Sequence, residues 1–544
     1  MARLRGTVYE AFCETASRTS ERDFLCVVPD TAARYGIEAR TWTYADAAAE
    51  IERLRKRFAR AGVGHGHRVG LMLENRPEFF FHWLALNAVG ASAVPLNLEW
   101  RGGELEYLIG HAELALAIVP EVRVEALRSA ARAAQHDVAV TTPNMATLEG
   151  VPTPAPIASI PDIETECALL YTSGTTGRPK GCVLPNAYFL EAGHWYLRIG
   201  GRAEVRDGSD RLITPLPMSH MNAMAFSTMV MILSGGCIVP LDRFHPTTWW
   251  ESVRVSGATI IHYLGVMPAM LMSAAPRADD PQHEVRFGFG AGVSAKLHAA
   301  FEARFGFPLL EAWAMTETGA GAAVIANREP RKIGTACFGR APADLDYRVV
   351  NDEGRPVGAG EAGELLVRVS GPEPRRGFFR EYLKEPAATA EAWEGGYFHT
   401  GDVVQVDVDG DFHFVDRKKN VIRRSGENIS AVEVEGTLLL HPQVLSAGVA
   451  AVRDDVRGDE VMACIVLRNP AAADRASLAR ELLSFCTERL AYYKAPGYVV
   501  FLDALPLTAT EKIQRAKLKE LAAACLSTPE CVDLRALKKR PVSA

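Results

Sequence analysis

The sequence contains few cysteines, and none has the spacing that disulfide frameworks or zinc sites use. Ten cysteines are spread over 544 residues, without a CxxC motif. This pattern suggests neither a disulfide framework nor a zinc ribbon. We therefore expect buried thiols in a reducing, cytoplasmic compartment.

A strong excess of charge of one sign is also missing. The net charge is -6, the pI is about 6.2, and hydrophobic and charged residues make up 48% and 23% of the chain. This balance is typical of folded globular proteins. Without a basic excess, we do not expect nucleic acid or an anionic membrane as the main partner. The expected partner is a small molecule.

Long uninterrupted hydrophobic segments are absent too. The opening MARLRGTVYEAF has no apolar core of secretory length, so we interpret it as mature protein. Residues 221–241 and 257–276 contain no Asp, Glu, Lys or Arg, but Gly235, Pro240 and Pro268 interrupt them. In each stretch we expect a buried strand next to a buried helix, and not a stable membrane span.

What the sequence does contain is a regular alternation of short apolar runs and helical patterns. One helix is expected to end at Gly62 and another to begin at Pro77. The alternation predicts an α/β fold with parallel sheets covered by helices, whose ligands gather at the carboxyl ends of the strands. The expected strands are 68–73, 91–96, 167–171, 212–216, 237–241, 258–264, 285–289 and 309–313.

From residue 344 the pattern changes to the alternation that is typical of β strands. Asp409-Gly410 lies between two alternating runs and predicts a tight hairpin turn. The acidic residues of QVDVDGDFHFVD do not form a calcium loop, because the glycine stands at the fourth position and no Glu closes the loop. A helix is expected over 475–489.

These patterns predict a large N-terminal domain and a smaller C-terminal one. The N-terminal domain, residues 1–417, consists of helix-covered sheets and a β-rich subdomain at 344–416. An α/β domain follows at 418–530. Residues 531–544 are expected to be a solvated tail.

The segment YTSGTTGRPKG, residues 171–181, combines glycines, hydroxyl groups and a lysine directly after an expected buried strand. Glycines allow backbone N–H groups to turn inward, and the hydroxyls and the lysine add donors and charge, so the loop suits a polyphosphate. It lacks the GK[ST] ending of a Walker A loop. A surface loop without a ligand is the alternative that this pattern disfavours. The residues concerned are Thr172, Ser173, Gly174, Thr175, Thr176, Gly177 and Lys180.

This loop resembles the phosphate-binding loop of the adenylate-forming superfamily, which includes acyl-CoA synthetases, luciferases and adenylation domains. The resemblance covers roughly residues 8–525, with further segments in family order: WAMTET at 313–318, YFHTGD at 397–402, DRKKNVIRRSGEN at 416–428 and EKIQR at 511–515. Together with the run at 377–390, these look most like acyl-CoA ligases of the crotonobetaine/carnitine type.

The resemblance implies an ATP-dependent ligase that joins a small carboxylic acid to coenzyme A, with Mg²⁺. The carboxylate attacks the α-phosphorus of ATP, giving an acyl-adenylate and pyrophosphate, and a thiol then displaces AMP. Because two anions must meet, the site needs preorganised cations and donors. A homodimer is the assembly that we consider.

The resemblance also assigns residues to this reaction. The 172–180 loop would hold the β- and γ-phosphates, and Lys512 would bridge the carboxylate and the α-phosphate. Taken singly, Trp313 could be a core residue, Asp402 a turn acceptor, and Arg417 and Lys512 solvated, but their joint order favours the site. The nucleotide residues would be Trp313 at the adenine, Thr316 at the α-phosphate, Glu317 for Mg²⁺, and Asp402 and Arg417 at the ribose.

Lys512 must leave the site before a thiol can enter, so the resemblance implies a mobile C-terminal domain. Lys419 would be its hinge, with an ordinary exposed lysine as the alternative, and Gly426 would line the pantetheine tunnel. The acyl pocket would come from residues 217–226 and 288–292, including Gly290, and from the surroundings of Met315. His220 would contact the acyl group, or it is a structural histidine.

Some positions depart from the family pattern, and two other functions stay open. Asn186, Ala314 and Glu511 replace a frequent His, Gly and Gly, respectively. One alternative is an adenylating enzyme that uses a carrier-protein thiol, an amine or nitrite. The other is a nucleotide-binding regulator without turnover, which the retention of Lys180, Glu317, Asp402 and Lys512 disfavours.

Overall fold

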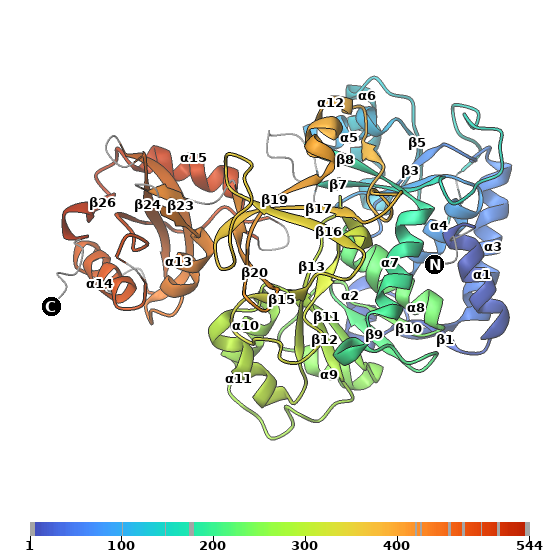
Figure 1. The fold of residues 1–544 in the computed structure, drawn as a ribbon. Coiled ribbons are helices and arrows are strands. Elements are labelled where there is room, and N and C mark those ends of the chain that lie inside the picture. The colour runs from blue at the N-terminus through green and yellow to red at the C-terminus, as the bar shows by residue number, and fades with distance from the viewer. Residues whose placement is uncertain are drawn as a thin grey trace. The chain divides into compact units, whose positions relative to one another are not determined.

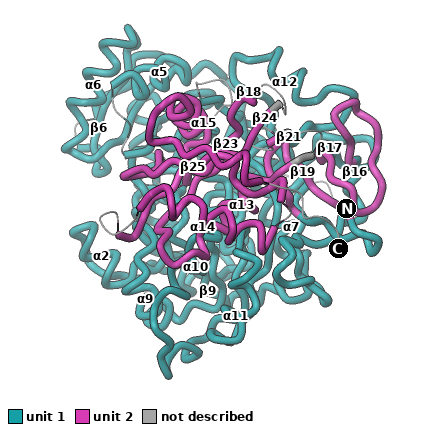
Figure 2. The backbone as a smooth tube through the Cα atoms, turned by 90° about the vertical axis from the view of Figure 1, so that its left-hand side faces the viewer, with its two compact units in different colours: residues 1–348, 366–400, 407–413 teal, residues 349–365, 401–406, 414–544 magenta. Residues whose placement is uncertain are grey.

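The computed structural model divides into two compact units (Figure 2). Unit 1 comprises Met1–Arg348, Leu366–Thr400 and Asp407–His413, and unit 2 comprises Val349–Leu365, Gly401–Val406 and Phe414–Ala544. The boundaries at residues 417 and 530 stay predictions. The structure describes residues 6–98, 100, 102–146, 148–172, 179–418, 422–424, 427–454, 458–469, 474–490, 492–508 and 512–538.

Unit 1 contains an eight-stranded sheet whose central strands are parallel. In sheet order the strands are β14 (Val324–Ile325), β13 (Leu309–Trp313), β12 (Phe287–Ala291), β11 (Ile260–Leu264), β9 (Arg211–Thr214), β10 (Cys237–Pro240), β1 (Asp23–Val27) and β2 (Arg40–Thr43). The edge strands β2 and β14 are antiparallel to their neighbours. The carboxyl ends of β9, β11, β12 and β13 therefore meet at one edge.

Helices follow the strands of this sheet, as the sequence pattern predicts. The two uncharged stretches form a helix beside a strand, as predicted: α8 (Thr228–Ser234) precedes β10, and α10 (Val266–Ser273) follows β11. α8 is buried, whereas α10 is only partly buried, with Val266 44% exposed. The π-helix η3 (Asn222–Ser227) precedes α8 directly. The other helices are α9 (Trp249–Ser256) and α11 (Ala295–Phe305).

A second sheet of unit 1 has seven strands and is mixed. In order they are β18 (Glu381–Tyr382), β8 (Lys180–Pro185), β7 (Glu166–Thr172), β4 (Ser92–Pro95), β3 (Arg68–Leu71), β5 (Leu114–Ile118) and β6 (Ala139–Thr141). β7 and β8 pair antiparallel, and so do β8 and β18. The prediction of parallel pairing is wrong here, because the stretch between Thr172 and Lys180 is too short for the crossover that parallel strands need.

Helices of unit 1 contact one another in a common layer (Figure 1). They are α1 (Val8–Arg18), α3 (Tyr44–Arg60), α4 (Pro77–Ala88), α7 (Asn186–Arg198) and α8. Capping boxes at Thr7 and Thr43 begin α1 and α3 and satisfy backbone donors there. The remaining helices of this unit are α2 (Pro29–Tyr35), α5 (Gly103–Ala112), α6 (Val124–Ala133) and α12 (Pro386–Ala392).

A five-stranded sheet contains the hairpin that was expected at Asp409-Gly410. Its order is β15 (Cys337–Arg340), β20 (Asp411–Arg417), β19 (Phe398–Val406), β17 (Ala362–Val369) and β16 (Leu345–Val350). Gly410 has a φ of 85°, which favours glycine in the turn between β19 and β20. β16, β17, β19 and β20 each contribute residues to both units.

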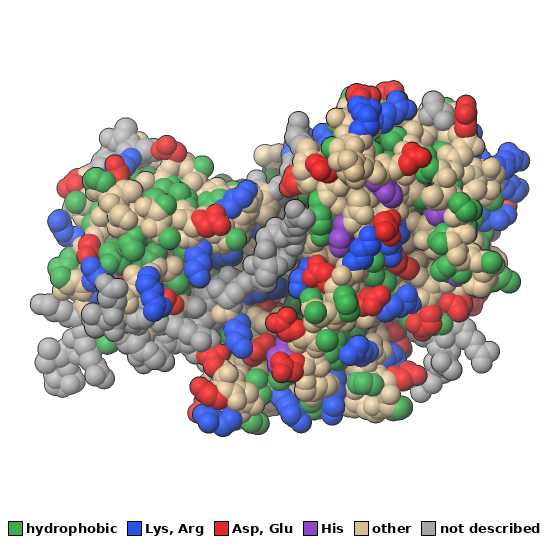
Figure 3. Space-filling view, turned by 90° about the horizontal axis from the view of Figure 1, so that it is seen from above, with side chains coloured by type: hydrophobic (Ala, Val, Ile, Leu, Met, Phe, Trp, Pro, Cys, Tyr) green, Lys and Arg blue, Asp and Glu red, His purple; other side chains and the backbone are tan. Residues whose placement is uncertain are grey.

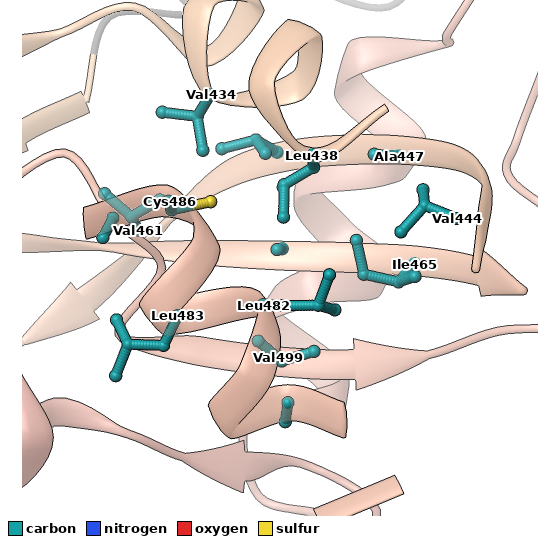
Figure 4. Packing of buried hydrophobic residues seen from close by; sticks show 14 of the residues in the cluster. Val434, Leu438, Val444, Ala447, Val461, Ile465, Leu482, Leu483, Cys486 and Val499 are labelled. Atoms are coloured by element: carbon teal, nitrogen blue, oxygen red, sulfur yellow. The ribbon is translucent and has the colours of Figure 1, made fainter. Parts of the chain in front are cut away.

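Unit 2 is built on a six-stranded sheet with a hydrophobic cluster on each face. Its order is β22 (Glu427–Ile429), β21 (Ile422–Arg424), β24 (Gly458–Leu467), β25 (Tyr498–Phe501) and β26 (Val532–Asp533), and β23 (Val444–Asp454) pairs with β24. Alternate residues of β24 belong to the two clusters, as the strand period requires. Figure 4 shows the cluster between the sheet, α13 (Ala431–Leu438) and α14 (Arg475–Thr487), while α15 (Arg515–Cys525) contacts β23.

The C-terminal segment is part of this unit. β26 pairs with β25, and Leu534 is 1% exposed within the first cluster. The Lys538 side chain is fully buried, with Nζ 2.6 Å from Glu460 Oε1. The prediction of a solvated tail is therefore wrong for residues 531–538, because a buried carboxylate far away in sequence receives this lysine.

The surface carries no dominant charge on the face that Figure 3 shows. Acidic and basic side chains are interspersed there, and hydrophobic ones are scattered. Within the described ranges, no helix combines the length and the apolar character that a membrane crossing requires. All ten cysteines are free thiols, seven of them buried.

Candidate active site

Two predicted site residues flank the stretch in which the sequence predicts a phosphate loop. Thr172 is the last residue of β7 and pairs with Lys180, the first residue of β8. Both ends of the loop therefore lie at the carboxyl end of β7, where an α/β fold places ligands. The other predicted loop residues, Ser173, Gly174, Thr175, Thr176 and Gly177, lie outside the described residues.

The Lys180 ammonium is held near the base of this loop. Its Nζ lies 3.8 Å from Glu385 Oε2 and 4.8 Å from the centroid of the Tyr382 ring. Only 22% of the Lys180 side chain is exposed. A partly desolvated cation acts more strongly on a nearby anion than one in bulk water, which suits a phosphate site.

Glu317, in the turn after β13, contacts the end of β7. The residue is 7% exposed, and Tyr382 Oη donates to its Oε1 at 3.0 Å. Thr172 Oγ1 also donates to Glu317 Oε1, at 3.4 Å. The structure thus brings Thr172, Lys180 and Glu317 together around Tyr382, a residue to which the sequence analysis assigned no role. In the sequence, Tyr382 stands out only as part of the run at 377–390. A hydrogen bond between residues far apart in the chain leaves no local sequence pattern by which it could be predicted.

The turn after β13 is held by backbone contacts. Thr318 Oγ1 accepts from Met315 N at 2.9 Å, and Tyr188 Oη donates to the Thr316 carbonyl at 2.9 Å. Trp313 is 6% exposed, and its ring centroid lies 6.0 Å from that of Phe338. The turn therefore gives Thr316 and Glu317 a defined backbone, and the contact between Trp313 and adenine stays a prediction.

The predicted acyl-pocket residues lie at the carboxyl edge of the eight-stranded sheet. His220 is exposed, and its backbone N–H donates to the Pro217 carbonyl at 2.9 Å. Gly290 is buried, and a Cβ there would lie 2.3 Å from the Tyr263 carbonyl oxygen. This close packing explains the glycine without a ligand, so the pocket roles of Gly290 and His220 stay predictions.

Unit 2 contains the other predicted nucleotide residues. Asp402 on β19 is 1% exposed, and Arg417 Nε on β20 lies 2.8 Å from its Oδ1. Desolvation by neighbouring protein atoms, followed by repulsion from Arg417, lowers the pKa of Lys512 below its usual value. Part of Lys512 is exposed to solvent, and the repulsion from Arg417 shows that the two cations lie close together in unit 2. Lys419 and Gly426 lie outside the described residues.

Asn186, which departs from the family pattern, has a structural role. It is fully buried at the start of α7, and its Oδ1 accepts from Val8 N at 3.0 Å and Asn87 Nδ2 at 2.8 Å. Its Nδ2 donates to the Asp162 carbonyl at 2.9 Å. Asn186 thus joins α1, α4 and the segment before β7 and does not depend on a ligand.

A group of carboxylates on the Asp409-Gly410 hairpin already has a cation. Asp407, Asp409 and Asp411 carry ligand atoms within 4.8 Å of one another, the one such group in the described ranges. Lys332 Nζ contacts all three, at 2.8 Å from Asp409 and from Asp411. The Lys332 ammonium therefore balances part of the negative charge of these three carboxylates.

Comparison with known proteins identifies the family. Residues 15–383 match the AMP-binding enzyme family, and residues 433–512 match the AMP-binding enzyme C-terminal domain. The crotonobetaine/carnitine–CoA ligase of Salmonella paratyphi A is 32% identical over 502 residues, which cover 88% of this chain and 93% of the relative. The ligase of the same name from Shigella sonnei is 30% identical over 503 residues, with the same coverage of 88% and 93%.

Solved structures share the fold over nearly the whole chain. The o-succinylbenzoate CoA synthetase MenE of Bacillus subtilis, in complex with its acyl-adenylate intermediate OSB-AMP, is 25% identical with a TM-score of 0.79 and covers 95% of this chain and 99% of its own. The anthranilate CoA ligase AuaEII, in complex with anthranoyl-AMP, is 24% identical with a TM-score of 0.81 and covers 97% and 99%. The chain therefore belongs to the AMP-binding enzyme family of adenylate-forming acyl-CoA ligases.

Proposed function

We propose that this protein activates a small carboxylic acid with ATP and Mg²⁺ and transfers the acyl group to coenzyme A. The observation that carries the proposal is the convergence of Thr172, Lys180 and Glu317 around Tyr382. A hydroxyl, an ammonium and a buried carboxylate at one loop are the groups that a metal-bound polyphosphate needs.

In the proposed site the 172–180 loop holds the β- and γ-phosphates. Glu317 is the carboxylate that would hold Mg²⁺, since this ion binds through one or two carboxylates together with phosphate oxygens. Mg²⁺ would supply positive charge at those oxygens. Thr316 donates to the α-phosphate, Trp313 lies against the adenine, and Asp402 and Arg417 bind the ribose. The pairing of Asp402 with Arg417 supports a shared role for these two residues.

Lys512 is the proposed catalytic cation of the first step. Its ammonium lies between the attacking carboxylate and the α-phosphate and offsets the charge that builds up as they approach. The C–O bond of the acid is retained, a new O–P bond forms, and pyrophosphate leaves. Rotation about Lys419 then brings Gly426 to the entering pantetheine.

Coenzyme A is the thiol that we propose, because the relatives compared above are named CoA ligases. A carrier-protein thiol, an amine or nitrite is the alternative nucleophile. The acid would lie in a pocket formed by residues 217–226 and 288–292 and by the surroundings of Met315. We also propose a cytoplasmic location and, for the assembly, a homodimer.

The test is a screen of short, aromatic, betaine and medium-chain acids, with detection of pyrophosphate and of AMP. An acid that releases pyrophosphate, with AMP release that depends on free coenzyme A, supports the proposal. AMP release that is indifferent to coenzyme A but needs another nucleophile favours the alternative. If no acid releases pyrophosphate, the proposed function is wrong.

Lys512→Ala tests the assignment of the first step. We expect loss of adenylate formation, while a supplied acyl-adenylate still reacts with coenzyme A at nearly the normal rate. Stopped-flow or quenched assays of the two half-reactions make the comparison. Equal loss in both half-reactions would contradict a role confined to adenylation.

A further inference from the structure

A buried histidine holds the side chain of Asn222 at the first residue of η3. His262 lies within β11 and is fully buried. Its Nε2 is 3.0 Å from Tyr196 Oη, and its Nδ1 is 2.7 Å from Asn222 Oδ1. Ser227 Oγ also lies 2.8 Å from Nδ1 and donates to the Asn222 carbonyl at 3.1 Å.

The network determines which nitrogen of His262 carries the proton. Burial lowers the pKa of His262 to about 3, so the ring is neutral and has one N–H. Tyr196 is fully buried, and in the described chain its hydroxyl has a hydrogen bond with His262 Nε2 alone. If Nε2 were the donor, the Tyr196 proton would be buried without an acceptor, which is unfavourable. Tyr196 therefore donates to Nε2, and Nδ1–H is the donor on the other side.

This tautomer fixes the orientation of the Asn222 amide. Nδ1–H donates to Oδ1 of Asn222, so the amide oxygen faces His262 and the amino group is turned away from it. Asn222 is partly exposed, and its Nδ2 makes no hydrogen bond within the described part of the chain. The protein thus presents a positioned donor on a π-helix, a form of helix that often occurs at functional sites.

Packed aromatic rings lie next to His262 and within η3. Asn222 belongs to the segment that follows β9 at the carboxyl edge of the eight-stranded sheet. Phe226 on η3 and Phe289 on β12 are 1% and 3% exposed, with ring centroids 6.0 Å apart, and Trp195 packs on Phe226 at 5.2 Å. Phe289 also stacks on His262, with ring centroids 4.6 Å apart.

We propose that Asn222 determines specificity by donating a hydrogen bond from Nδ2 to the acyl chain of the substrate. The substrate class is then short carboxylic acids that carry an acceptor oxygen on the acyl chain, such as oxo or hydroxy acids. The inference rests on the acyl pocket of the proposed function. An apolar chain at this place would leave the amino group desolvated and without a partner, which disfavours purely aliphatic acids.

The experiment compares acids that differ by one acceptor oxygen. Pairs of equal size, such as 4-oxopentanoate and 4-methylpentanoate, with further pairs branched at the third and fifth carbons, are assayed by acid-dependent ATP–pyrophosphate exchange, which needs no coenzyme A. For at least one pair we expect kcat/KM of the native protein to favour the oxo acid by roughly tenfold or more. Asn222→Leu, with the same branching at Cγ but no polar atom, should reduce the preference to about twofold or less.

The ratio of kcat/KM for the two acids of a pair does not depend on the fraction of folded protein. A loss of stability in a variant therefore cannot produce this change of preference. Asn222→Asp is the second variant: its carboxylate accepts from His262 but offers no donor, and it should also lose the preference. A native protein that exchanges pyrophosphate without favouring any oxo acid, or a preference that survives in Asn222→Leu, overturns the inference. The absence of exchange with every acid would instead refute the proposed function and the inference with it.

Discussion

The position of the Glu317 carboxylate depends on hydroxyl groups from two other segments of unit 1. Tyr382 and Thr172 both donate to its Oε1, and the Tyr382 ring also faces the Lys180 ammonium. Residues that orient a metal-binding carboxylate often matter nearly as much as the ligand itself. A role for Tyr382 follows from this geometry.

Tyr382→Phe keeps the ring beside Lys180 and removes only the donor to Glu317. We expect the Mg²⁺ concentration for half-maximal pyrophosphate release to rise by about tenfold or more. Titration of Mg²⁺ at saturating ATP measures it. Tyr397→Phe is the matched control, because the Tyr397 hydroxyl donates to Asp346 at 2.9 Å and, within the described part of the chain, makes no hydrogen bond with Thr172, Lys180 or Glu317. An unchanged Mg²⁺ requirement in Tyr382→Phe would count against the positioning role.

The pH dependence of adenylation should also be set by single side chains, Lys512 and Arg417. The pKa of Lys512 lies below its usual value because of desolvation and, next, repulsion from Arg417. The ammonium is present below this pKa, so activity should fall as the pH rises through it. Arg417→Gln removes the repulsion, raises the pKa, and should move the alkaline limb to higher pH. Pyrophosphate exchange at saturating ATP records the limb, and a shift to lower pH would contradict the assignment.

At the scale of secondary-structure elements, a buried ion triad joins β21, β24 and the C-terminal segment. Glu460 Oε2 lies 2.7 Å from Arg424 Nε, and Glu460 Oε1 lies 2.6 Å from Lys538 Nζ. The side chains of Arg424, Glu460 and Lys538 are 2%, 0% and 0% exposed. One carboxylate therefore balances two buried cations, and the three positions should respond unequally to substitution.

Glu460→Gln leaves two buried cations facing each other and should cost about 3–5 kcal/mol of stability. Lys538→Met replaces one cation by an apolar chain of similar length and leaves a neutral Arg424–Glu460 pair, so its cost should be much smaller. Thermal midpoints of the two variants, measured under identical conditions, test this order. A larger loss in Lys538→Met would show that the tail lysine, and not the charge balance, holds the unit together.

At the scale of the whole molecule, the proposed reaction needs two arrangements of the C-terminal part, with Lys419 as the hinge. Lys419→Pro restricts the backbone at this position, whereas Lys419→Ala removes only the charge. We expect Lys419→Pro to slow acyl transfer to coenzyme A by about tenfold or more, with pyrophosphate exchange changed by no more than about threefold. Rate measurements of the two half-reactions separate these effects. Equal behaviour of the Pro and Ala variants would argue against a backbone hinge.

Much of the fold could be predicted because its signals are local. Strand and helix periods, Gly62, Pro77 and the Asp409-Gly410 turn each act over a few neighbouring residues. Pairing is different: β7 and β8 run antiparallel although their sequences resemble parallel strands. The packing of residues 531–538 also could not be predicted, because Glu460, the buried partner of Lys538, lies 78 residues away in the sequence.

The sequence by itself determined the family and the order of the motifs, since these depend on residue types at short spacing. The tertiary structure alone decided that Tyr382 orients Glu317 across 65 residues and that His262 turns the Asn222 amide across 40. Such contacts form between side chains that only folding brings together. Their hydrogen-bond geometry, which no local pattern encodes, determines what each group can do.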